Sequence, residues 1–229
     1  MLTDIQSTTT LHNGVEMPML GLGTWRAGDG EEVYNAVRAA LDLGYRHVDT
    51  AAIYNNEKGV GRAIQDSGIP RDQLFVTTKL WNDDQRSGEI RQAFDASLDR
   101  LGLDYVDLYL IHWAIPDRYL DAWSGLEKIH QAGGARAIGV SNFQRHHLED
   151  ILRQCDVRPM VNQIELHPRL AQVDLTRWCQ DQDIVVEAWS PIMKGQVLEI
   201  PQLREIADRH GKTPVQVTLR WDLQRGIVT

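Results

Sequence analysis

The chain has 229 residues, of which 42% are hydrophobic, so it can bury one sizeable core, and nothing in it forces a division into two domains. Its net charge is −8, with acids and bases interspersed, which argues against nucleic acid or an anionic membrane as the main partner. No apolar run approaches a membrane-spanning helix, and the first ten residues do not resemble a signal peptide. We therefore expect a single cytoplasmic domain over residues 1–229.

Alternation of short strands and helices is the main pattern along the chain. Asn13-Gly14 lies between two short extended runs, which predicts a tight hairpin. Apolar and β-branched runs then predict eight strands, over residues 19–24, 47–51, 74–80, 105–113, 136–142, 160–166, 184–190 and 226–229. Segments with apolar residues three and four apart lie between them and predict helices, for example over 31–44, 89–102, 148–155 and 203–211.

Eight strands that alternate with helices predict a closed (β/α)₈ TIM barrel, preceded by the hairpin and ending in this chain at the eighth strand. The alternative is an open dinucleotide-binding sheet, which requires G-x-G-x-x-G after the first strand. The nearest match starts at Gly21-Leu22-Gly23 and has Arg26 in place of the third glycine. Gly59 and Gly61 lie in a helical stretch, where we expect them to serve close packing rather than phosphate binding.

Four ionisable side chains stand at the ends of three consecutive predicted strands: Asp49, Tyr54, Lys79 and His112. In a TIM barrel the catalytic groups lie at these carboxyl ends. Each residue alone also has a structural interpretation, such as a helix cap, packing, a solvated strand end or a satisfied core histidine. Together they fit a proton donor whose pKa is tuned by a cation, which in turn has a counter-charge.

The sequence resembles the aldo-keto reductase family, in particular its compact microbial members. The matching segments, in chain order, are GLGTW, GYRHVDTAAIYNNE, TTKLW, LIHW, RAIGVSNF, NQIELHP, EAWSPI and GKTPVQVTLRW. The resemblance implies an NAD(P)H-dependent carbonyl reductase in which Asp49, Tyr54, Lys79 and His112 are the catalytic residues. Tyr54 would donate the proton, with its pKa lowered by Lys79. Asp49 would keep Lys79 charged, and a neutral His112 would orient the carbonyl oxygen.

The resemblance also assigns ligand contacts, and the cofactor it implies is NADPH, with NADH not excluded. The implied cofactor-binding residues are Gly23, Thr24, Trp25, Asp49, Ser141, Asn142, Gln163, Trp189, Ser190, Ile192, Lys194 and Gly195. The implied substrate-binding residues are Trp25, Tyr54, Trp81, His112 and Trp113. Strand-end capping is the alternative interpretation of Asn142 and Gln163. Small aldehydes, dicarbonyls or keto-sugars are the expected substrates.

Other expectations concern partners and chain length. Cys155 and Cys179 are expected to be free thiols, and no metal is expected in the site. The protein is expected to be a monomer that binds neither nucleic acid nor membrane. A non-catalytic, cofactor-binding regulatory subunit on the same fold is the alternative function. In the family the eighth strand leads into a segment that binds the 2′-phosphate and into a final helix and tail, so we expect the natural protein to continue beyond Thr229.

Overall fold

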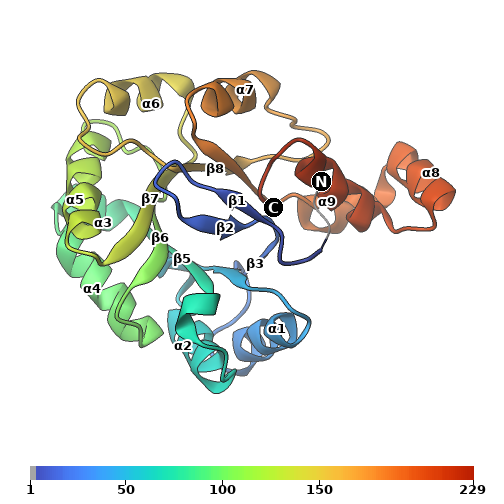
Figure 1. Ribbon diagram of the computed structural model, residues 1–229, viewed down its shortest axis with the longest axis horizontal. Helices are drawn as coiled ribbons and strands as arrows, with labels where there is room; N and C mark the ends of the chain where they lie inside the picture. Colours follow the sequence, from blue (N-terminus) through green and yellow to red (C-terminus); the bar gives the residue numbers. More distant parts are fainter. Residues whose placement is uncertain (1–3) are drawn as a thin grey trace.

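The computed structural model describes residues 4–229, which form a ring of parallel strands surrounded by helices (Figure 1). The strands pair in chain order, β3-β4-β5-β6-β7-β8-β9, and all of these pairs are parallel. Their bounds are Gly21–Gly23 (β3), His47–Asp49 (β4), Phe75–Leu80 (β5), Val106–Ile111 (β6), Ala135–Ser141 (β7), Val161–Glu165 (β8) and Val185–Trp189 (β9). Every residue of β5 and β6 is buried, as expected for strands covered on both faces.

The ring is closed by residues 227–229, which bond to strands on both sides. The Val228 amide donates to the Val186 carbonyl at 3.0 Å, and the Val228 carbonyl accepts from Ala188 at 2.8 Å. On the other side Thr229 exchanges hydrogen bonds with Met19 and Gly21, each at 2.9 Å. The predicted (β/α)₈ barrel is therefore confirmed, but the predicted strand 226–229 is shortened to an isolated bridge. Gly226 still belongs to the turn after the preceding helix, at φ +70°.

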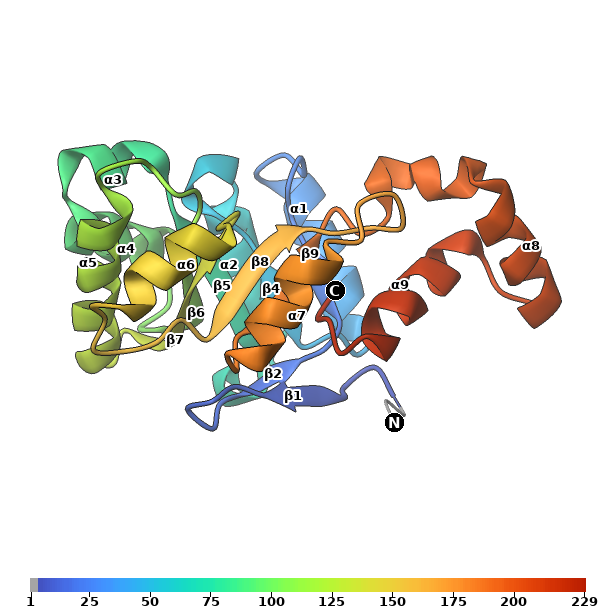
Figure 2. The same cartoon turned by 90° about the horizontal axis from the view of Figure 1, so that it is seen from above.

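The predicted N-terminal hairpin consists of β1 (Thr8–Thr10) and β2 (Glu16–Pro18), which pair antiparallel. Gly14 takes a left-handed φ of +85° in its turn, a conformation that glycine adopts without strain. The hairpin lies across one end of the barrel (Figure 2), where Leu11 and Met17 are buried. Asn13 Nδ2 donates to the carbonyl of Arg136 near the start of β7, so this is the N-terminal end of the strands.

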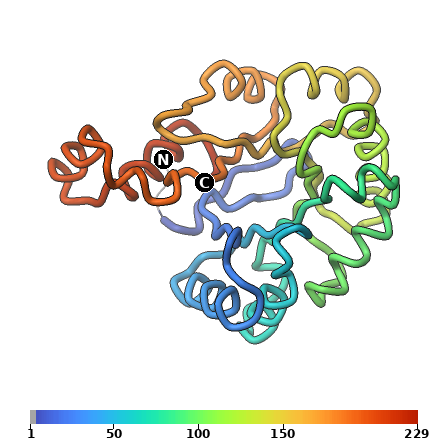
Figure 3. Tube along the Cα trace, turned by 180° about the vertical axis from the view of Figure 1, so that it is seen from behind, coloured from blue at the N-terminus to red at the C-terminus, as the bar shows by residue number. Residues whose placement is uncertain are grey.

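Helices surround the strands, and the last two extend to one side (Figures 1 and 3). Their bounds are Glu31–Asp42 (α1), Glu57–Asp66 (α2), Asn82–Ser87 (α3), Ile90–Leu101 (α4), Tyr119–Gln131 (α5), Arg145–Leu152 (α6), Val173–Asp181 (α7), Pro201–His210 (α8) and Pro214–Gln224 (α9). Short 3-10 segments span Ala52–Tyr54 (η1) and Arg71–Gln73 (η2), and η3 (Met193–Glu199) consists of two helical turns separated by a kink at Lys194 and Gly195. Helices α8 and α9 and η3 share a small apolar cluster of their own, which contains Val197 and Leu203.

The two glycines of α2 are packing residues, as the sequence predicted. A Cβ atom on Gly61 would clash with the backbone carbonyl of Leu101 at the end of α4, and one on Gly59 would clash with Val33 of α1. Helix α2 can therefore approach both neighbours closely. Neither glycine lies at a strand end where a phosphate group would be bound.

Candidate active site

Three adjacent strands bring the four predicted catalytic side chains to the C-terminal end of the barrel. Asp49 is the last residue of β4, Lys79 the penultimate residue of β5, and His112 follows β6 directly. Tyr54 ends η1, the short 3-10 turn that follows β4. The parallel ladder fixes this arrangement, since Asp49 pairs in register with Thr77 and Lys79 with Leu110.

Lys79 lies in the barrel interior with a fully buried side chain. Its Nζ donates to Asp49 Oδ1 at 2.5 Å and to the Thr50 carbonyl at 2.9 Å. The other oxygen of Asp49 accepts from Gln163 Nε2 at 2.8 Å. Burial alone lowers the pKa of Lys79, but the negative charges of Asp49 and the other acidic neighbours outweigh it and raise the pKa. Lys79 is therefore a buried cation held by Asp49.

Tyr54 is half-buried beside this cation. Lys79 Nζ lies 5.2 Å from the centre of the phenol ring, and the imidazole of His112 meets the ring edge-on at 5.8 Å between centroids. Burial raises the pKa of Tyr54, and although Lys79 lowers it, the net direction is upward. Lys79 thus lowers the pKa of Tyr54 as predicted, but desolvation of the phenolate, which the prediction did not include, outweighs the ammonium charge.

His112 is a neutral imidazole, as predicted. Burial lowers its pKa to about 3, and the nearby Lys79 charge acts in the same direction. The indole of Trp81 packs edge-on against it at 5.2 Å between centroids. Its Nδ1 is buried and has no hydrogen-bond partner within residues 4–229. This ring can therefore offer or accept a hydrogen bond without carrying charge.

The three tryptophans predicted to bind substrate all lie at this end of the barrel. Trp25 follows β3 and is 48% exposed, Trp81 follows β5, and Trp113 lies just after β6 and is 42% exposed. Trp81 alone among them makes ring contact with the four central side chains in the part of the chain that the structure describes. Trp25 instead lies close to two cations, with Arg26 4.5 Å and Lys194 5.0 Å from its ring centre.

The predicted cofactor residues of β7, β8 and β9 form one hydrogen-bonded group. Asn142, in the left-handed conformation at φ 62°, donates to the His112 carbonyl and to Ser141 Oγ, both at 3.0 Å. Its oxygen accepts from Trp189 Nε1 at 2.8 Å, which fixes the indole at the end of β9. The capping interpretation thus describes part of what Asn142 does, whereas Gln163 bonds to the Asp49 carboxylate rather than to backbone.

The remaining predicted cofactor residues lie in the loops after β3 and β9. Thr24 is buried, and both its amide and its hydroxyl donate to the Asp49 carbonyl, at 2.9 and 3.0 Å. A Cβ on Gly23 or Gly195 would meet no atom within 4 Å, so there is open space beside both. Ser190, Met193 and Lys194 have φ values from 52° to 55°, a costly conformation for residues other than glycine. Ile192 lies in the same loop, directly before η3.

Two buried residues of the interior escaped the sequence analysis. Glu187, in the middle of β9, is only 4% exposed, and His47, at the start of β4, is fully buried. A signal was available for Glu187, because an acidic residue inside the apolar run IVVEAWS is unusual for a buried strand. The Asp49 and Lys79 charges both act on it.

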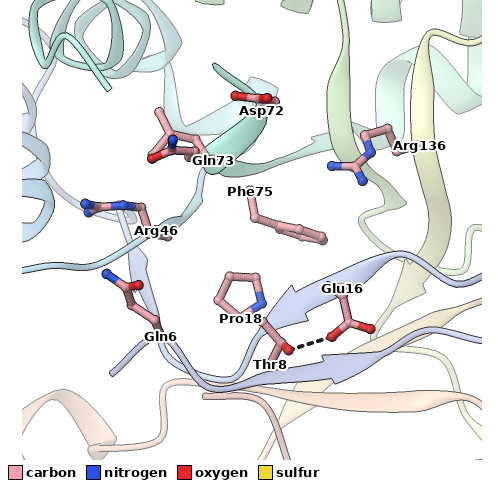
Figure 4. Close-up of a pocket in the computed structure, with 10 residues that line it drawn as sticks. Gln6, Thr8, Glu16, Pro18, Arg46, Asp72, Gln73, Phe75 and Arg136 are labelled. Atoms are coloured by element: carbon pink, nitrogen blue, oxygen red, sulfur yellow. Dashed lines mark hydrogen bonds between the residues drawn. The ribbon is translucent and has the colours of Figure 1, made fainter. Parts of the chain in front are cut away.

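A cavity of ≈ 230 Å³ lies at the opposite end of the barrel (Figure 4). Phe75 and Pro18 line it, together with Arg46 and Arg136, which stand at or just before the N-terminal ends of their strands. It is therefore remote from the four predicted catalytic side chains. Among residues 4–229 no group of three or more His, Cys, Asp or Glu side chains is arranged to hold a metal ion. None of the helices described there is long and apolar enough to cross a membrane. Both cysteines are free, as predicted.

Comparisons with known proteins agree with this geometry. The model of the aldo/keto reductase family matches residues 19–229. The chain is 54% identical to the glyoxal reductase of Bacillus subtilis, over all of this chain and 83% of that protein. It is 47% identical to the methylglyoxal reductase of Salmonella typhimurium, over 95% of this chain and 80% of that protein. A crystal structure of an aldo-keto reductase complexed with NADPH matches with a TM-score of 0.90 and 38% identity, over 97% of this chain and 77% of that one. The chain therefore belongs to the aldo/keto reductase family.

Proposed function

We propose that this protein, an NAD(P)H-dependent oxidoreductase by its family, reduces small aldehydes and α-dicarbonyl compounds to alcohols with NADPH, and that Tyr54 is the proton donor. One observation carries the proposal. A fully buried ammonium, Lys79, is paired with Asp49 and lies against a half-buried phenol and a neutral imidazole. In such an arrangement the phenol can donate a proton to an oxygen on which negative charge develops.

Tyr54 holds the transferable proton, and Lys79 makes its release easier. Reduction builds negative charge on the carbonyl oxygen, which then takes the phenolic proton. The phenolate left behind is stabilised by the Lys79 charge, 5.2 Å from the ring centre. Asp49, in turn held by Gln163, keeps Lys79 charged and in place.

His112 orients the substrate in this proposal. Because its pKa is lowered to about 3, it is neutral over the whole physiological range and does not compete with Tyr54 as a proton donor. A hydrogen bond from the imidazole to the carbonyl oxygen would hold that oxygen near the phenol. Trp81 packs edge-on against the imidazole and helps to hold it in place.

The residues of β7 to β9 fit a nicotinamide cofactor. The Trp189 indole is fixed through its Nε1 and offers a flat face, while Ser141 and Gln163 place polar groups beside it on the neighbouring strands. We assign ring stacking to Trp189 and carboxamide contacts to Ser141, Asn142 and Gln163. The loops with Gly23, Thr24, Trp25, Ser190, Ile192, Lys194 and Gly195 would hold the rest of the cofactor. When bound, NADPH supplies the hydride that adds to the carbonyl carbon.

Small dicarbonyls are the substrate class that we favour. Trp81 packs against His112, and Trp25 and Trp113 present exposed ring surface at the same end of the barrel, which suits a small uncharged substrate. A second carbonyl beside the first makes the reacting carbon more electrophilic. The names of two relatives, a glyoxal reductase and a methylglyoxal reductase, point to the same class.

A substrate panel tests this proposal. We expect glyoxal and methylglyoxal to give kcat/KM values at least about tenfold above those of simple monoaldehydes, a difference of about 1.4 kcal/mol in transition-state stabilisation. NADPH and NADH are compared with each substrate, and chelator treatment should leave the rates unchanged. NADPH binding without turnover of any carbonyl would instead favour the non-catalytic regulatory subunit. The expected monomeric state and cytoplasmic location remain predictions.

A further inference from the structure

Glu187 lies one layer below the Asp49–Lys79 pair inside the barrel. Side chains two residues apart on a strand point to the same face, so His47 lies below Asp49 on β4 and Thr77 below Lys79 on β5. Glu187 joins this lower layer from β9, where it pairs in register with Gln163 of β8. Its Oε1 is 3.7 Å from His47 Nε2, and the same nitrogen is 3.2 Å from Thr77 Oγ1.

Among the described residues no lysine or arginine forms an ion pair with Glu187, whose basic partner is His47. Burial lowers the pKa of His47 to about 4, so its imidazole is uncharged at neutral pH. The second carboxyl oxygen, Oε2, is buried and has no hydrogen-bond partner within residues 4–229. An ionised carboxylate in such surroundings is costly, because buried charges are normally paired and hydrogen-bonded.

The charges of the two layers are balanced when only one of the two carboxyl groups, Asp49 or Glu187, is ionised. Lys79 is the cation of this interior, and Asp49 already holds it at 2.5 Å. If Glu187 were also ionised, the group would carry a net charge of about −1 in an interior of low dielectric, where charge is poorly screened. Burial and the Asp49 charge raise the pKa of Glu187 to about 8, against the opposing effects of Gln163 and Lys79.

We propose that Glu187 is a positioning residue of the reductase site, a carboxyl group that is uncharged at neutral pH and that ionises in alkali, where its charge helps Tyr54 keep the proton it must donate. The kinetic part of this inference rests on the proposed function of Tyr54. The protonation of Glu187 does not rest on it.

The sign of the effect follows from the groups that face Glu187. These are His47 and Asp49 on β4, Thr77 and Lys79 on β5, and Gln163 on β8. At pH values below the pKa of Glu187 this carboxyl is uncharged, so the pKa of Tyr54 responds to the charges of Lys79 and Asp49 without that of Glu187. Above it, the new negative charge raises the pKa values of both Tyr54 and Lys79. Tyr54 then remains a phenol, and thus an acid, at a higher pH than it otherwise would.

Infrared spectroscopy measures the protonation of Glu187 without any turnover. We expect a C=O stretching band of a protonated buried carboxyl at pH 7 that disappears with a midpoint near pH 8 in the intact protein. Asp222 is the matched control, because it is also buried and its pKa is raised to about 7. A protonated Asp222 gives a similar band, which Asp222→Asn should remove. The band that remains in this variant belongs to Glu187, so it is assigned even if Glu187→Gln does not fold. Absence of a protonated carboxyl band in Asp222→Asn at pH 7 would overturn the inference.

The kinetic readout is the alkaline limb of the pH profile of carbonyl reduction. In Glu187→Gln this limb should move to lower pH by about one unit, the order of effect of a single charge that acts through a partly polar interior. In Asp222→Asn the limb should not move. An unchanged limb in Glu187→Gln would make Glu187 a packing residue only. If the infrared result holds while the wild-type protein shows no turnover, the proposed function fails and the protonation of Glu187 stands.

Discussion

At the residue scale, the site depends on one buried cation that acts on several neighbours. Lys79 neutralises Asp49, opposes the rise in the pKa of Tyr54 and contributes to the lowered pKa of His112. The sequence located these four side chains correctly because strand ends are recognisable from the alternation of elements. It could not give the direction of the Tyr54 pKa, since desolvation depends on burial by segments far apart in the chain. Glu187 was missed although the sequence carried a signal for it, an acidic residue inside the apolar run IVVEAWS.

Tyr54→Phe removes the phenolic proton that we propose Tyr54 donates, and it changes little else in the side chain. We expect kcat for carbonyl reduction to fall by about 10²-fold to 10⁴-fold, the usual contribution of a general acid. Binding of NADPH, followed by fluorescence titration, serves as the control for an intact site. A variant that turns over at the wild-type rate would show that another group donates the proton.

Lys79→Met removes the charge that lowers the pKa of Tyr54 and leaves the Asp49 carboxylate with Gln163 as its remaining side-chain partner. The alkaline limb of the pH profile should therefore move to higher pH, while turnover falls because the phenolate is no longer stabilised. Steady-state rates measured from pH 6 to 10 give both quantities. A profile that keeps its midpoint would make Lys79 a structural residue.

At the element scale, the strand–helix alternation was sufficient to predict the barrel, because each predicted strand carries an apolar run that only a covered sheet can bury. The limits of individual elements were harder to predict. Strand 226–229 is reduced to an isolated bridge, since Gly226 is still part of the turn that ends α9. The helix predicted over 148–155 instead spans Arg145–Leu152, because Gln144 and His147 form a capping box that starts it three residues earlier.

Gly61→Ala tests the close packing of α2 against α4. The added methyl group would meet the Leu101 backbone carbonyl, which cannot move away as a side chain could, so we expect a loss of about 1–3 kcal/mol in the free energy of unfolding. Gln65→Ala, an exposed change in the same helix, is the control and should stay within about 0.5 kcal/mol. Urea unfolding compares the two. Equal stability of both variants would contradict the packing role.

At the scale of the whole molecule, buried ionisable groups make stability depend on pH in opposite directions. The pKa values of His47 and His112 are lowered by folding, so both destabilise the fold as pH falls below about 6.5. Folding raises the pKa of Glu187 to about 8 and that of Asp222 to about 7. Each carboxyl group therefore destabilises the fold as the pH rises toward its folded pKa. Between about pH 7 and 8 the contribution of Glu187 dominates among these four.

The free energy of unfolding should therefore fall on the order of 1 kcal/mol from pH 7 to pH 8 in the wild-type protein. Glu187→Gln should flatten this fall, because glutamine does not ionise, whereas Asp222→Asn should retain it. Urea unfolding at closely spaced pH values provides the measurement. The same slope in Glu187→Gln as in the wild type would mean that Glu187 is already ionised at pH 7.

The most direct test of carbonyl reduction at this site follows the hydride itself. The protein is incubated with methylglyoxal and NADPH that carries deuterium at the transferable position of C4, and the alcohol is analysed by mass spectrometry. We predict one deuterium on the new carbinol carbon for each NADPH consumed, at a rate about 10²-fold to 10⁴-fold lower in Tyr54→Phe. An alcohol that carries no deuterium, or no alcohol at all, would contradict the account.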